Sequence, residues 1–186
     1  MTASPQIEAF LSHLQIERRM SPHTLDAYRR DLDALAAWTT ELGVADVSAL
    51  HTEPLRAFIA AEHRRGLSPK SLQRRLSACR SFYLWLLKHG CIAASPAAGL
   101  RAPKAPRKLP QVLDVDEAVQ LVELPTDVPL GLRDRAILEL FYSSGLRLSE
   151  LCALRWRDLD LVEGLVTVLG KGGKERMVPL SPPARA

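Results

Sequence analysis

Residues 67–89, with the sequence LSPKSLQRRLSACRSFYLWLLKH, carry the strongest helix pattern of the chain and decide the fold of its first half. Ser68 is a good N-cap, Pro69 suits the first helical turn, and Leu67 before the cap can act as a hydrophobic staple. Apolar residues then recur at intervals of three and four positions, at Leu72, Leu76, Cys79, Tyr83 and Leu86. This spacing predicts a long amphipathic helix that buries one face in a core.

Three earlier segments have the same helical spacing of apolar residues. Their stripes consist of Ile7, Phe10, Leu11 and Leu14, then Leu25, Tyr28, Leu32 and Leu35, and then Leu55, Phe58 and Ile59. The second of these helices is predicted to begin at an N-cap, Ser21, followed by Pro22, just as the fourth begins at Ser68. We therefore predict a four-helix domain over residues 1–90.

Positive charge is concentrated in one part of the chain. The whole sequence has 25 Lys and Arg against 21 Asp and Glu, a formal net charge of +4. No acidic residue lies between Glu62 and Asp114, whereas the basic residues of this interval are Arg64, Arg65, Lys70, Arg74, Arg75, Arg80, Lys88, Arg101, Lys104, Arg107 and Lys108. One interpretation is a solvated basic face followed by a basic linker. The absence of counter-charge favours the other, a surface that binds a polyanion.

The capped helix starts at Ser21 and Ser68 are each followed by an arginine pair, at residues 29–30 and 74–75. Capping alone explains the serines, so two well-capped helices are one interpretation. The free N–H groups and the dipole of a helix N-terminus also favour an anion. The arginines beside these helix starts therefore predict a phosphate-binding surface.

Residues 95–110, SPAAGLRAPKAPRKLP, have no helix or strand period and are rich in proline, alanine and basic residues. They predict an extended linker. The expected organisation is a helical domain over residues 1–90, a basic linker over 91–110 and a second domain over 111–186. A cationic, semi-stiff linker suits a protein that closes around a duplex, although a plain spacer is also consistent with this composition.

The second half of the chain mixes helix and strand patterns. The predicted helices are residues 114–124, residues 131–144 with Ile137, Leu140 and Phe141 inward, and a further turn or two over 146–151. The predicted strands, 165–169 and 174–180, flank a glycine-rich turn at 170–173 and form a β-hairpin. This turn is not a phosphate-binding P-loop, because it lacks the P-loop spacing and lies between two strands.

The composition, with 47% apolar and 25% charged residues, is typical of a soluble globular protein. No apolar run approaches the roughly 20 residues that span a bilayer, and the N-terminus has no signal-peptide pattern. We therefore expect a cytoplasmic protein with no membrane partner. The three cysteines, Cys79, Cys91 and Cys152, are an odd number without zinc-ligand spacing. Buried thiols are expected, with neither disulfides nor a metal site.

Two strings in the second half resemble the tyrosine recombinase (phage integrase) family: residues 142–151, YSSGLRLSEL, and residues 170–180, GKGGKERMVPL. The start of the second helix, the linker at 102–107 and the string RDRA at 133–136 are similar to the Xer branch of that family. The resemblance covers essentially the whole chain and implies a mainly α fold. Its parts are a four-helix SAM-like core-binding domain and the first part of an α+β catalytic domain with a small antiparallel β-hairpin or sheet.

The resemblance also implies a chemistry, in which a tyrosine hydroxyl attacks a DNA phosphodiester, forms a 3′-phosphotyrosine and needs no metal or nucleotide cofactor. Arg147 matches the first catalytic arginine of the family, and its planar guanidinium suits two non-bridging phosphate oxygens. Lys171 matches the catalytic lysine, which acts as general acid, and Lys174 is the second candidate for this role. Glu150, three residues after Arg147, is expected to orient the guanidinium.

The partners that the resemblance implies are double-stranded DNA and a second Xer-type recombinase subunit in a tetramer on DNA. The implied role of the complete enzyme is the resolution of chromosome dimers at cell division. The residues expected to contact DNA are Ser21, Arg29, Arg30, Ser68, Lys70, Arg74, Arg75, Arg80, Lys104, Lys174 and Arg176.

The sequence contains no His-x-x-Arg motif, which the family has after the lysine, and its last tyrosine is Tyr142. Tyr142 is expected to lie in the core rather than to act as the nucleophile. On this basis the 186 residues are expected not to complete strand cleavage by themselves. The alternatives are a non-catalytic DNA-binding module that interferes with intact recombinases, and a helical protein–protein adaptor whose binding is indifferent to salt.

Overall fold

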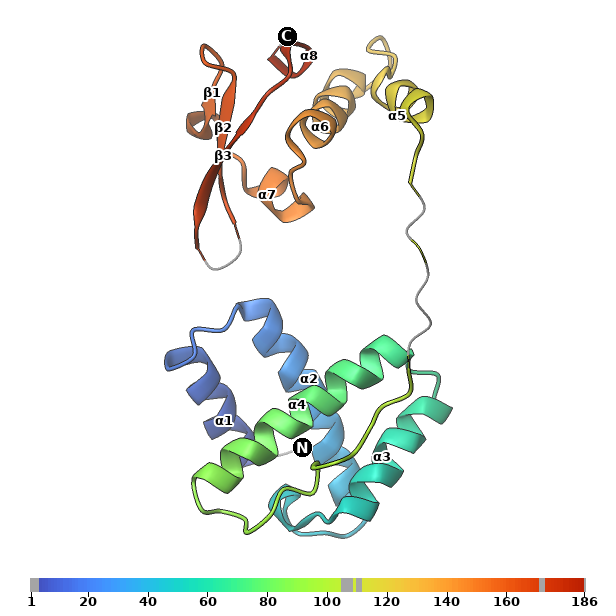
Figure 1. The fold of residues 1–186 in the computed structure, drawn as a ribbon, viewed down its shortest axis with the longest axis vertical. Helices are drawn as coiled ribbons and strands as arrows, with labels where there is room; N and C mark the ends of the chain where they lie inside the picture. Colours follow the sequence, from blue (N-terminus) through green and yellow to red (C-terminus); the bar gives the residue numbers. More distant parts are fainter. Residues whose placement is uncertain (1–3, 105–108, 110–111, 171–172, 186) are drawn as a thin grey trace. The chain divides into compact units, whose positions relative to one another are not determined.

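The computed structural model describes residues 4–104, 109, 112–170 and 173–185 (Figure 1). The chain divides into two compact units, Met1–Lys108 and Leu109–Ala186, and each is described by itself. Within the described part of the chain, no helix has both the length and the apolar character needed to cross a membrane.

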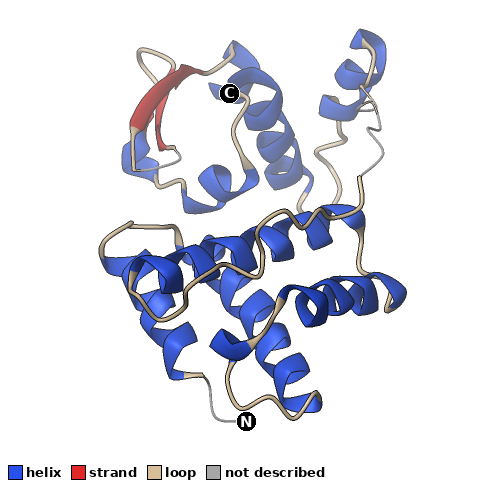
Figure 2. Ribbon diagram, turned by 60° about the horizontal axis from the view of Figure 1, so that its bottom comes forward, coloured by secondary structure: helices blue, strands red, loops and turns tan. Residues whose placement is uncertain are grey.

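The first unit contains the four predicted helices. They are α1 (Pro5–Ile16), α2 (Pro22–Glu41), α3 (Thr52–Arg64) and α4 (Pro69–Lys88), with a short 3-10 helix, η1 (Val47–Ala49), between α2 and α3. Helix α4 contacts each of the other three and is the central element of the bundle (Figures 1 and 2). The helices predicted from the apolar stripes are therefore confirmed.

Both predicted serine caps are present. The Ser21 hydroxyl oxygen accepts a hydrogen bond from the backbone N–H of Thr24 at 3.3 Å, and that of Ser68 accepts one from the backbone N–H of Ser71 at 3.2 Å. A proline occupies the first turn after each cap, where its missing N–H costs no hydrogen bond. These caps fix where α2 and α4 begin.

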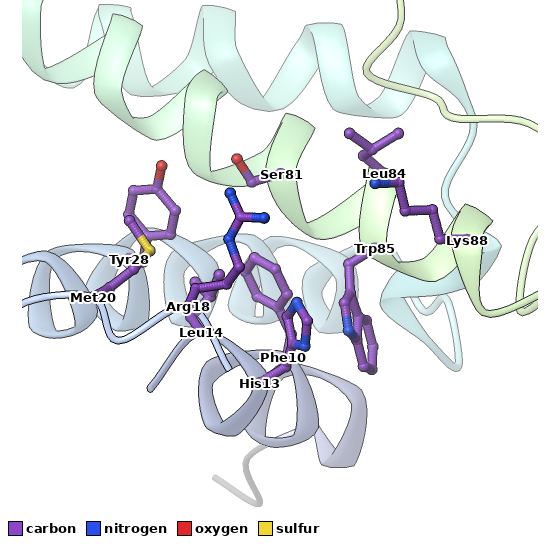
Figure 3. A pocket seen from close by; sticks show the side chains of 10 residues that line it. All are labelled: Phe10, His13, Leu14, Arg18, Met20, Tyr28, Ser81, Leu84, Trp85 and Lys88. Atoms are coloured by element: carbon purple, nitrogen blue, oxygen red, sulfur yellow. The ribbon is translucent and has the colours of Figure 1, made fainter. Parts of the chain in front are cut away.

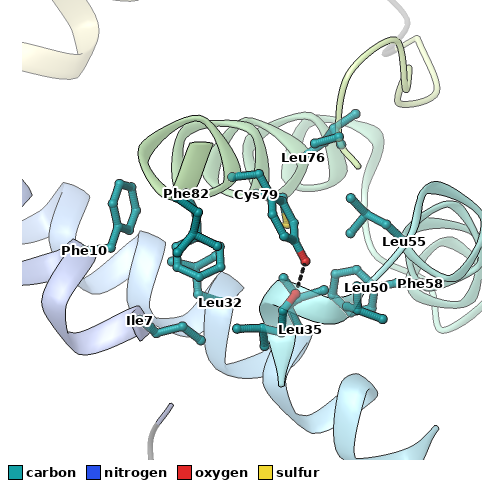
Figure 4. Close-up of a cluster of buried hydrophobic side chains, with 14 of the residues drawn as sticks. Ile7, Phe10, Leu32, Leu35, Leu50, Leu55, Phe58, Leu76, Cys79 and Phe82 are labelled. Atoms are coloured by element: carbon teal, nitrogen blue, oxygen red, sulfur yellow. Dashed lines mark hydrogen bonds between the residues drawn. The ribbon is translucent and has the colours of Figure 1, made fainter. Parts of the chain in front are cut away.

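The core of the first unit is built from the predicted stripes (Figure 4). Its fully buried side chains include Ile7, Phe10, Leu32, Leu35, Leu55, Phe58, Leu72, Leu76, Phe82, Tyr83 and Leu86. The Tyr83 hydroxyl donates a hydrogen bond to the Val47 carbonyl oxygen at 2.8 Å, so this buried polar group is satisfied. The bond also attaches η1 to α4.

The stretch after α4 packs against the first unit rather than running free. Ala97 and Leu100 are buried in its core. Arg80 donates a hydrogen bond to the Leu100 carbonyl oxygen, and Gln73 donates one to the Pro103 carbonyl oxygen at 3.1 Å. The prediction of a backbone without helix or strand is correct for this stretch. Its buried apolar residues and the hydrogen bonds from α4 nevertheless attach it to the first unit as far as Pro103.

The second unit is a mixed helical and stranded structure. Its elements are α5 (Val115–Val122), α6 (Gly131–Ser144), α7 (Leu148–Ala153), η2 (Trp156–Asp158), β1 (Leu159–Asp160), β2 (Leu165–Leu169), β3 (Glu175–Pro179) and α8 (Pro182–Arg185). The strands form an antiparallel sheet in the order β1-β2-β3. The predicted hairpin is β2 and β3, paired from Leu165 opposite Pro179 to Leu169 opposite Glu175. Neither the two-residue strand β1 nor the short helix α8 was predicted.

A small core holds the second unit together. Leu146, Val166, Val168 and Leu180 are buried there, and Leu140 and Phe141 of α6 pack against them. The hydroxyl of Ser144, the last residue of α6, donates a hydrogen bond to the Pro179 carbonyl oxygen at 2.8 Å. The C-terminal end of α6 is therefore attached to β3, next to the segment that carries Arg147.

Two expectations about buried residues are wrong. Tyr142 is 59% exposed, because α6 packs through Leu140 and Phe141 and the tyrosine lies outside that face. Of the three cysteines, only Cys79 is buried, where desolvation raises the pKa of its thiol to about 12. Cys91 follows the C-terminal end of α4 and Cys152 lies near the end of α7, and both are exposed.

Candidate catalytic cluster and nucleic-acid interface

Arg147 is placed by the turn between α6 and α7. Gly145 is the C-cap residue of α6, and its φ of 56° is a left-handed conformation that glycine adopts without strain. The next residue, Leu146, is buried in the small core, and Arg147 follows as the N-cap residue of α7 with a side chain that is 63% exposed. The Gly-Leu-Arg string therefore turns the chain, anchors it and presents a guanidinium to solvent.

Glu150 holds Arg147, as predicted from their spacing. Its Oε1 accepts a hydrogen bond from Arg147 Nη1 at 2.7 Å, and its Oε2 accepts one from the Arg147 backbone N–H at 2.8 Å. The sequence did not reveal that Arg176 of β3 binds the same carboxylate, with Nη1 2.6 Å from Oε1 and Nη2 2.9 Å from Oε2. Glu150 therefore joins α7 to the hairpin.

These contacts lower the pKa of the Glu150 carboxyl to about 2. The hydrogen bonds from Arg176 contribute most, followed by the backbone N–H of Arg147, while desolvation acts in the opposite direction. The carboxylate is therefore ionised throughout the neutral range, and it keeps both guanidinium groups in place by charge-assisted hydrogen bonds.

The depressed pKa predicts how the cluster responds to acid. Because the folded-state pKa of about 2 lies below the ordinary value of 4.5, the fold favours the ionised form of Glu150. The resulting contribution to stability is complete above pH 4.5 and is lost as the pH falls from 4.5 towards 2. Titration of the Glu150 side-chain carboxyl by carbon NMR checks this expectation. A midpoint near the ordinary value would show that the two arginines do not hold the carboxylate in solution.

One candidate lysine lies in the glycine-rich turn and the other directly follows it. Lys171 lies outside the described residues, so its role as general acid stays a prediction. Lys174 is exposed at the end of the turn, and its carbonyl oxygen accepts a hydrogen bond from the Gly170 N–H at 2.7 Å. This bond closes the turn on the side that leads into β3.

In the first unit, acidic residues from other helices neutralise several of the predicted DNA contacts. Arg29 forms a two-bond ion pair with Glu8 of α1, with Nη2 2.9 Å from Oε2. Arg74 binds the Asp31 carboxylate and donates a hydrogen bond to the Ala27 carbonyl oxygen at 3.1 Å, but its side chain remains 41% exposed. The acid-free interval in the sequence is therefore not free of acid partners in space.

Arg75 does not lie on the surface, which corrects the expectation that it contacts DNA. Its side chain is only 10% exposed. It binds Asp31 of α2, with Nε 3.1 Å from Oδ1, and Glu62 of α3, while its Cζ lies 5.8 Å from the centre of the Phe58 ring. Through Nε and Nη1 the guanidinium joins α2, α3 and α4.

The remaining candidates in the first unit are exposed. Ser21, Arg30, Ser68, Lys70, Arg80 and Lys104 all have exposed side chains. Ser21 and Ser68 also serve as caps, and Arg80 holds the stretch after α4. Arg30, Lys70 and Lys104 form no ion pair among the residues that the structure describes, so their charges are accessible to a phosphate.

A hollow of about 390 Å³ lies elsewhere on the first unit, between α1 and α4 (Figure 3). Phe10 and Trp85 form part of its apolar lining, and Arg18 and Lys88 supply positive charge. It includes none of the residues predicted to contact DNA. The predicted DNA-binding surface therefore does not include this hollow, and it stays a prediction.

Comparison with known proteins agrees with both halves of this description. Residues 7–90 match the family model described as Phage integrase, N-terminal SAM-like domain, and residues 111–186 match the Phage integrase family. The chain belongs to the tyrosine recombinase (phage integrase) family. Among curated relatives, it is 78% identical over 174 residues to Tyrosine recombinase XerC of Xanthomonas campestris pv. campestris (strain B100), and 52% identical over 180 residues to that of Pseudomonas aeruginosa (strain LESB58).

These matches cover 94% and 96% of this chain but 54% and 59% of the two relatives, so the chain spans little more than half of their length. The predicted resemblance to the Xer branch is confirmed, since these relatives carry the name Tyrosine recombinase XerC. Among solved structures, a lambda integrase tetramer bound to a Holliday junction matches with a TM-score of 0.69 at 22% identity, covering 94% of this chain and 49% of that one.

The Tn1549 transposon integrase in complex with a circular intermediate DNA matches with a TM-score of 0.73 at 13% identity, over 98% of this chain and 63% of that one. Identities this low show the fold alone. They confirm the predicted mainly α architecture, with a SAM-like first domain and a small antiparallel sheet in the second.

Proposed function

We propose that this protein takes part in site-specific DNA recombination as a Xer-type tyrosine recombinase, which cleaves and rejoins strands through a 3′-phosphotyrosine. The observation that carries the proposal is the arrangement of Arg147. Its guanidinium is held at one nitrogen, Nη1, by Glu150 while the side chain is 63% exposed, and the sequence resemblance matches this residue to the family's catalytic arginine. A guanidinium fixed in this way is suited to bind a phosphodiester.

The chemistry follows from the charges that develop in the reaction. Arg147 would donate hydrogen bonds to the non-bridging oxygens of the phosphoryl group, where negative charge accumulates. Lys171 would protonate the departing 5′-oxygen as general acid. Neither step requires a metal or a nucleotide, because the phosphotyrosine bond conserves the energy of the broken phosphodiester. Tyr142 is not proposed as the nucleophile.

The first unit would hold the duplex. Arg30 and Lys70 would contact the phosphate backbone through their exposed charges, with Arg74 beside them. Each of α2 and α4 also begins at a serine cap, and the positive end of a helix dipole favours an anion there. Contacts of this kind give affinity and orientation on DNA without reading its sequence.

The biological role within this proposal is the resolution of chromosome dimers at cell division, in the cytoplasm, by a tetramer that includes a second Xer-type subunit. Support comes from the name Tyrosine recombinase XerC carried by relatives up to 78% identical, and from the lambda integrase tetramer on a Holliday junction. A second candidate is a DNA-binding module that does not cleave. The exposed charges of Arg30 and Lys70 would serve such a function as well.

The test is equilibrium binding of the chain to a duplex with a Xer-type site and to a scrambled duplex, each over a series of salt concentrations. Replacing Arg30 and Lys70 together by alanine should weaken binding to both duplexes and reduce the salt slope by about two, roughly one for each lost phosphate contact. These two residues form no ion pair in the described structure, so their removal should leave the fold intact.

The matched control replaces Arg56 and Arg133 by alanine, which removes the same charge from exposed positions outside the proposed interface. Equal salt slopes for this control and for the Arg30→Ala/Lys70→Ala variant would contradict the interface. Binding that is indifferent to salt would contradict DNA binding altogether. Preference for the Xer-type site would support recombinase function over a module that binds DNA of any sequence.

A further inference from the structure

Arg176 and Arg147 lie far apart in the sequence but share one carboxylate. Each oxygen of Glu150 accepts one hydrogen bond from each arginine. Arg176 uses both of its terminal nitrogens in the parallel two-bond arrangement that suits a guanidinium and a carboxylate. Arg147 uses only Nη1 of its side chain and adds its backbone N–H. The two arginines therefore make unequal use of Glu150.

The exposure of the three side chains follows the same division. The side chain of Glu150 is 4% exposed, the side chain of Arg176 is 35% exposed and the side chain of Arg147 is 63% exposed. Arg176 turns both terminal nitrogens towards Glu150, whereas Arg147 keeps Nε and Nη2 outside the bonds to Glu150. A guanidinium that is anchored at one nitrogen and open at the others is prepared to receive two phosphate oxygens.

We propose that Arg176 is a positioning residue, which occupies one side of Glu150 so that Arg147 stays turned outward towards the phosphate. The inference rests on the proposed function of Arg147. Without Arg176, the Glu150 carboxylate would be free to take a second N–H of Arg147 in a parallel pair of its own. The guanidinium would then turn inward, and fewer of its donors would remain for a ligand.

The position of Arg176 on the hairpin extends this role to the glycine-rich turn. Arg176 pairs with Val168 across the sheet, and a Cβ built at Gly170 would lie 3.3 Å from Arg176 Nη1 and 3.2 Å from the Lys174 carbonyl oxygen. The absence of a side chain at Gly170 thus leaves room for the Arg176 guanidinium to reach Glu150. Through the bonds of Arg176 to Glu150, β3 is joined to the helix start that carries Arg147.

The experiment follows the Arg147 side chain by NMR in the labelled 186-residue chain while inorganic phosphate is added. In Arg176→Gln, phosphate should bind at Arg147 about tenfold more weakly than in the original chain, as expected for the loss of one or two charged hydrogen bonds. Arg176→Lys keeps the charge but not the two-bond geometry, so it should rescue the affinity only in part. The pKa of Glu150 should rise in Arg176→Gln, because its largest lowering contact is gone.

The matched control is Arg133→Gln, which removes an exposed arginine of the same unit that pairs only with the neighbouring Asp134 among the described residues. It should leave the phosphate affinity at Arg147 unchanged. If Arg176→Gln unfolds the second unit, Arg176→Lys provides the same comparison with the charge retained. Wild-type phosphate affinity at Arg147 in either folded variant, with unchanged Glu150 and Arg147 resonances, would overturn the positioning role.

The outcome for the original chain separates this inference from the proposed function. An Arg147 resonance in the original chain that does not respond to phosphate would count against the proposed role of Arg147 itself. The resonances of Glu150 and Arg147 without phosphate would still show whether Arg176 sets their arrangement. Failure of the positioning role alone would appear as a normal phosphate response that does not depend on Arg176.

Discussion

Replacing Asp31 by alanine is expected to lower the free energy of unfolding of the first unit by about 3 kcal/mol. Removal of one member of a buried ion pair costs about 3–5 kcal/mol, because the remaining charge is left without its partner. Asp31 is completely buried and binds both Arg74 and Arg75. The low end of the range is expected because Arg75 keeps Glu62, and Arg74 is exposed enough to turn to solvent.

Urea unfolding of the chain, followed by the fluorescence of Trp38 and Trp85 in the first unit, measures this effect. A double-mutant cycle with Arg75→Met should give a coupling energy of about 1–3 kcal/mol between the two positions. Arg56→Ala, which breaks an exposed pair with Glu53, is the control and should cost less than about 0.5 kcal/mol. A loss as small as that of the control in Asp31→Ala would show that the buried network is not formed in solution.

The network has a cost as well as a benefit. Burial raises the pKa of the Asp31 carboxyl above its ordinary value, and the hydrogen bond from Arg75 and the charge of Arg74 act against this. The contacts with the arginines therefore do not fully offset the desolvation cost of the ionised carboxylate, which is common for buried ion pairs. What the network provides is a fixed relation between α2, α3 and α4. The same carboxylate also holds Arg74 beside the proposed DNA surface.

The pairing of the arginines with acidic residues of other helices could not be predicted from the sequence. The acid-free interval after Glu62 predicted a concentrated cationic surface, but Asp31 of α2 and Glu62 of α3 bind Arg74 and Arg75 of that interval. Charge along a sequence does not determine charge in space once helices pack side by side. One signal was available: Asp31 occupies the apolar stripe of α2 between Tyr28 and Leu35, and an acid at such a position needs a buried partner.

The candidate catalytic cluster was predictable in part. Arg147 and Glu150 are three residues apart at the start of one helix, so their contact follows from local geometry. The bond from Arg176 to Glu150 depends on how the hairpin packs against α7, which no local pattern contains. The helices with strong apolar periods were predicted well for the same reason. The two-residue strand β1 and the four-residue helix α8 are too short to show a period.

Replacing Phe58 by alanine is expected to destabilise the first unit by about 3–5 kcal/mol, the range for removal of a buried phenylalanine side chain from a core. The Phe58 side chain is fully buried. Its ring lies 6.1 Å from the ring of Trp38, and the Arg75 guanidinium carbon lies 5.8 Å from its centre. The substitution would therefore open a cavity and also remove the aromatic face against which the buried guanidinium packs.

Urea unfolding again measures the loss, and Phe58→Leu is the matched control because it retains most of the apolar volume. The control should cost less than about 1.5 kcal/mol if volume dominates, since such replacements are tolerated best. A cycle that combines Phe58→Leu with Arg75→Met isolates the contact between ring and cation, which is expected to be worth about 0.5–2 kcal/mol. Coupling in that range would mean that the apolar core and the buried charge network stabilise each other. No coupling would mean that Asp31 and Glu62 alone position Arg75, and that the ring contributes only its volume.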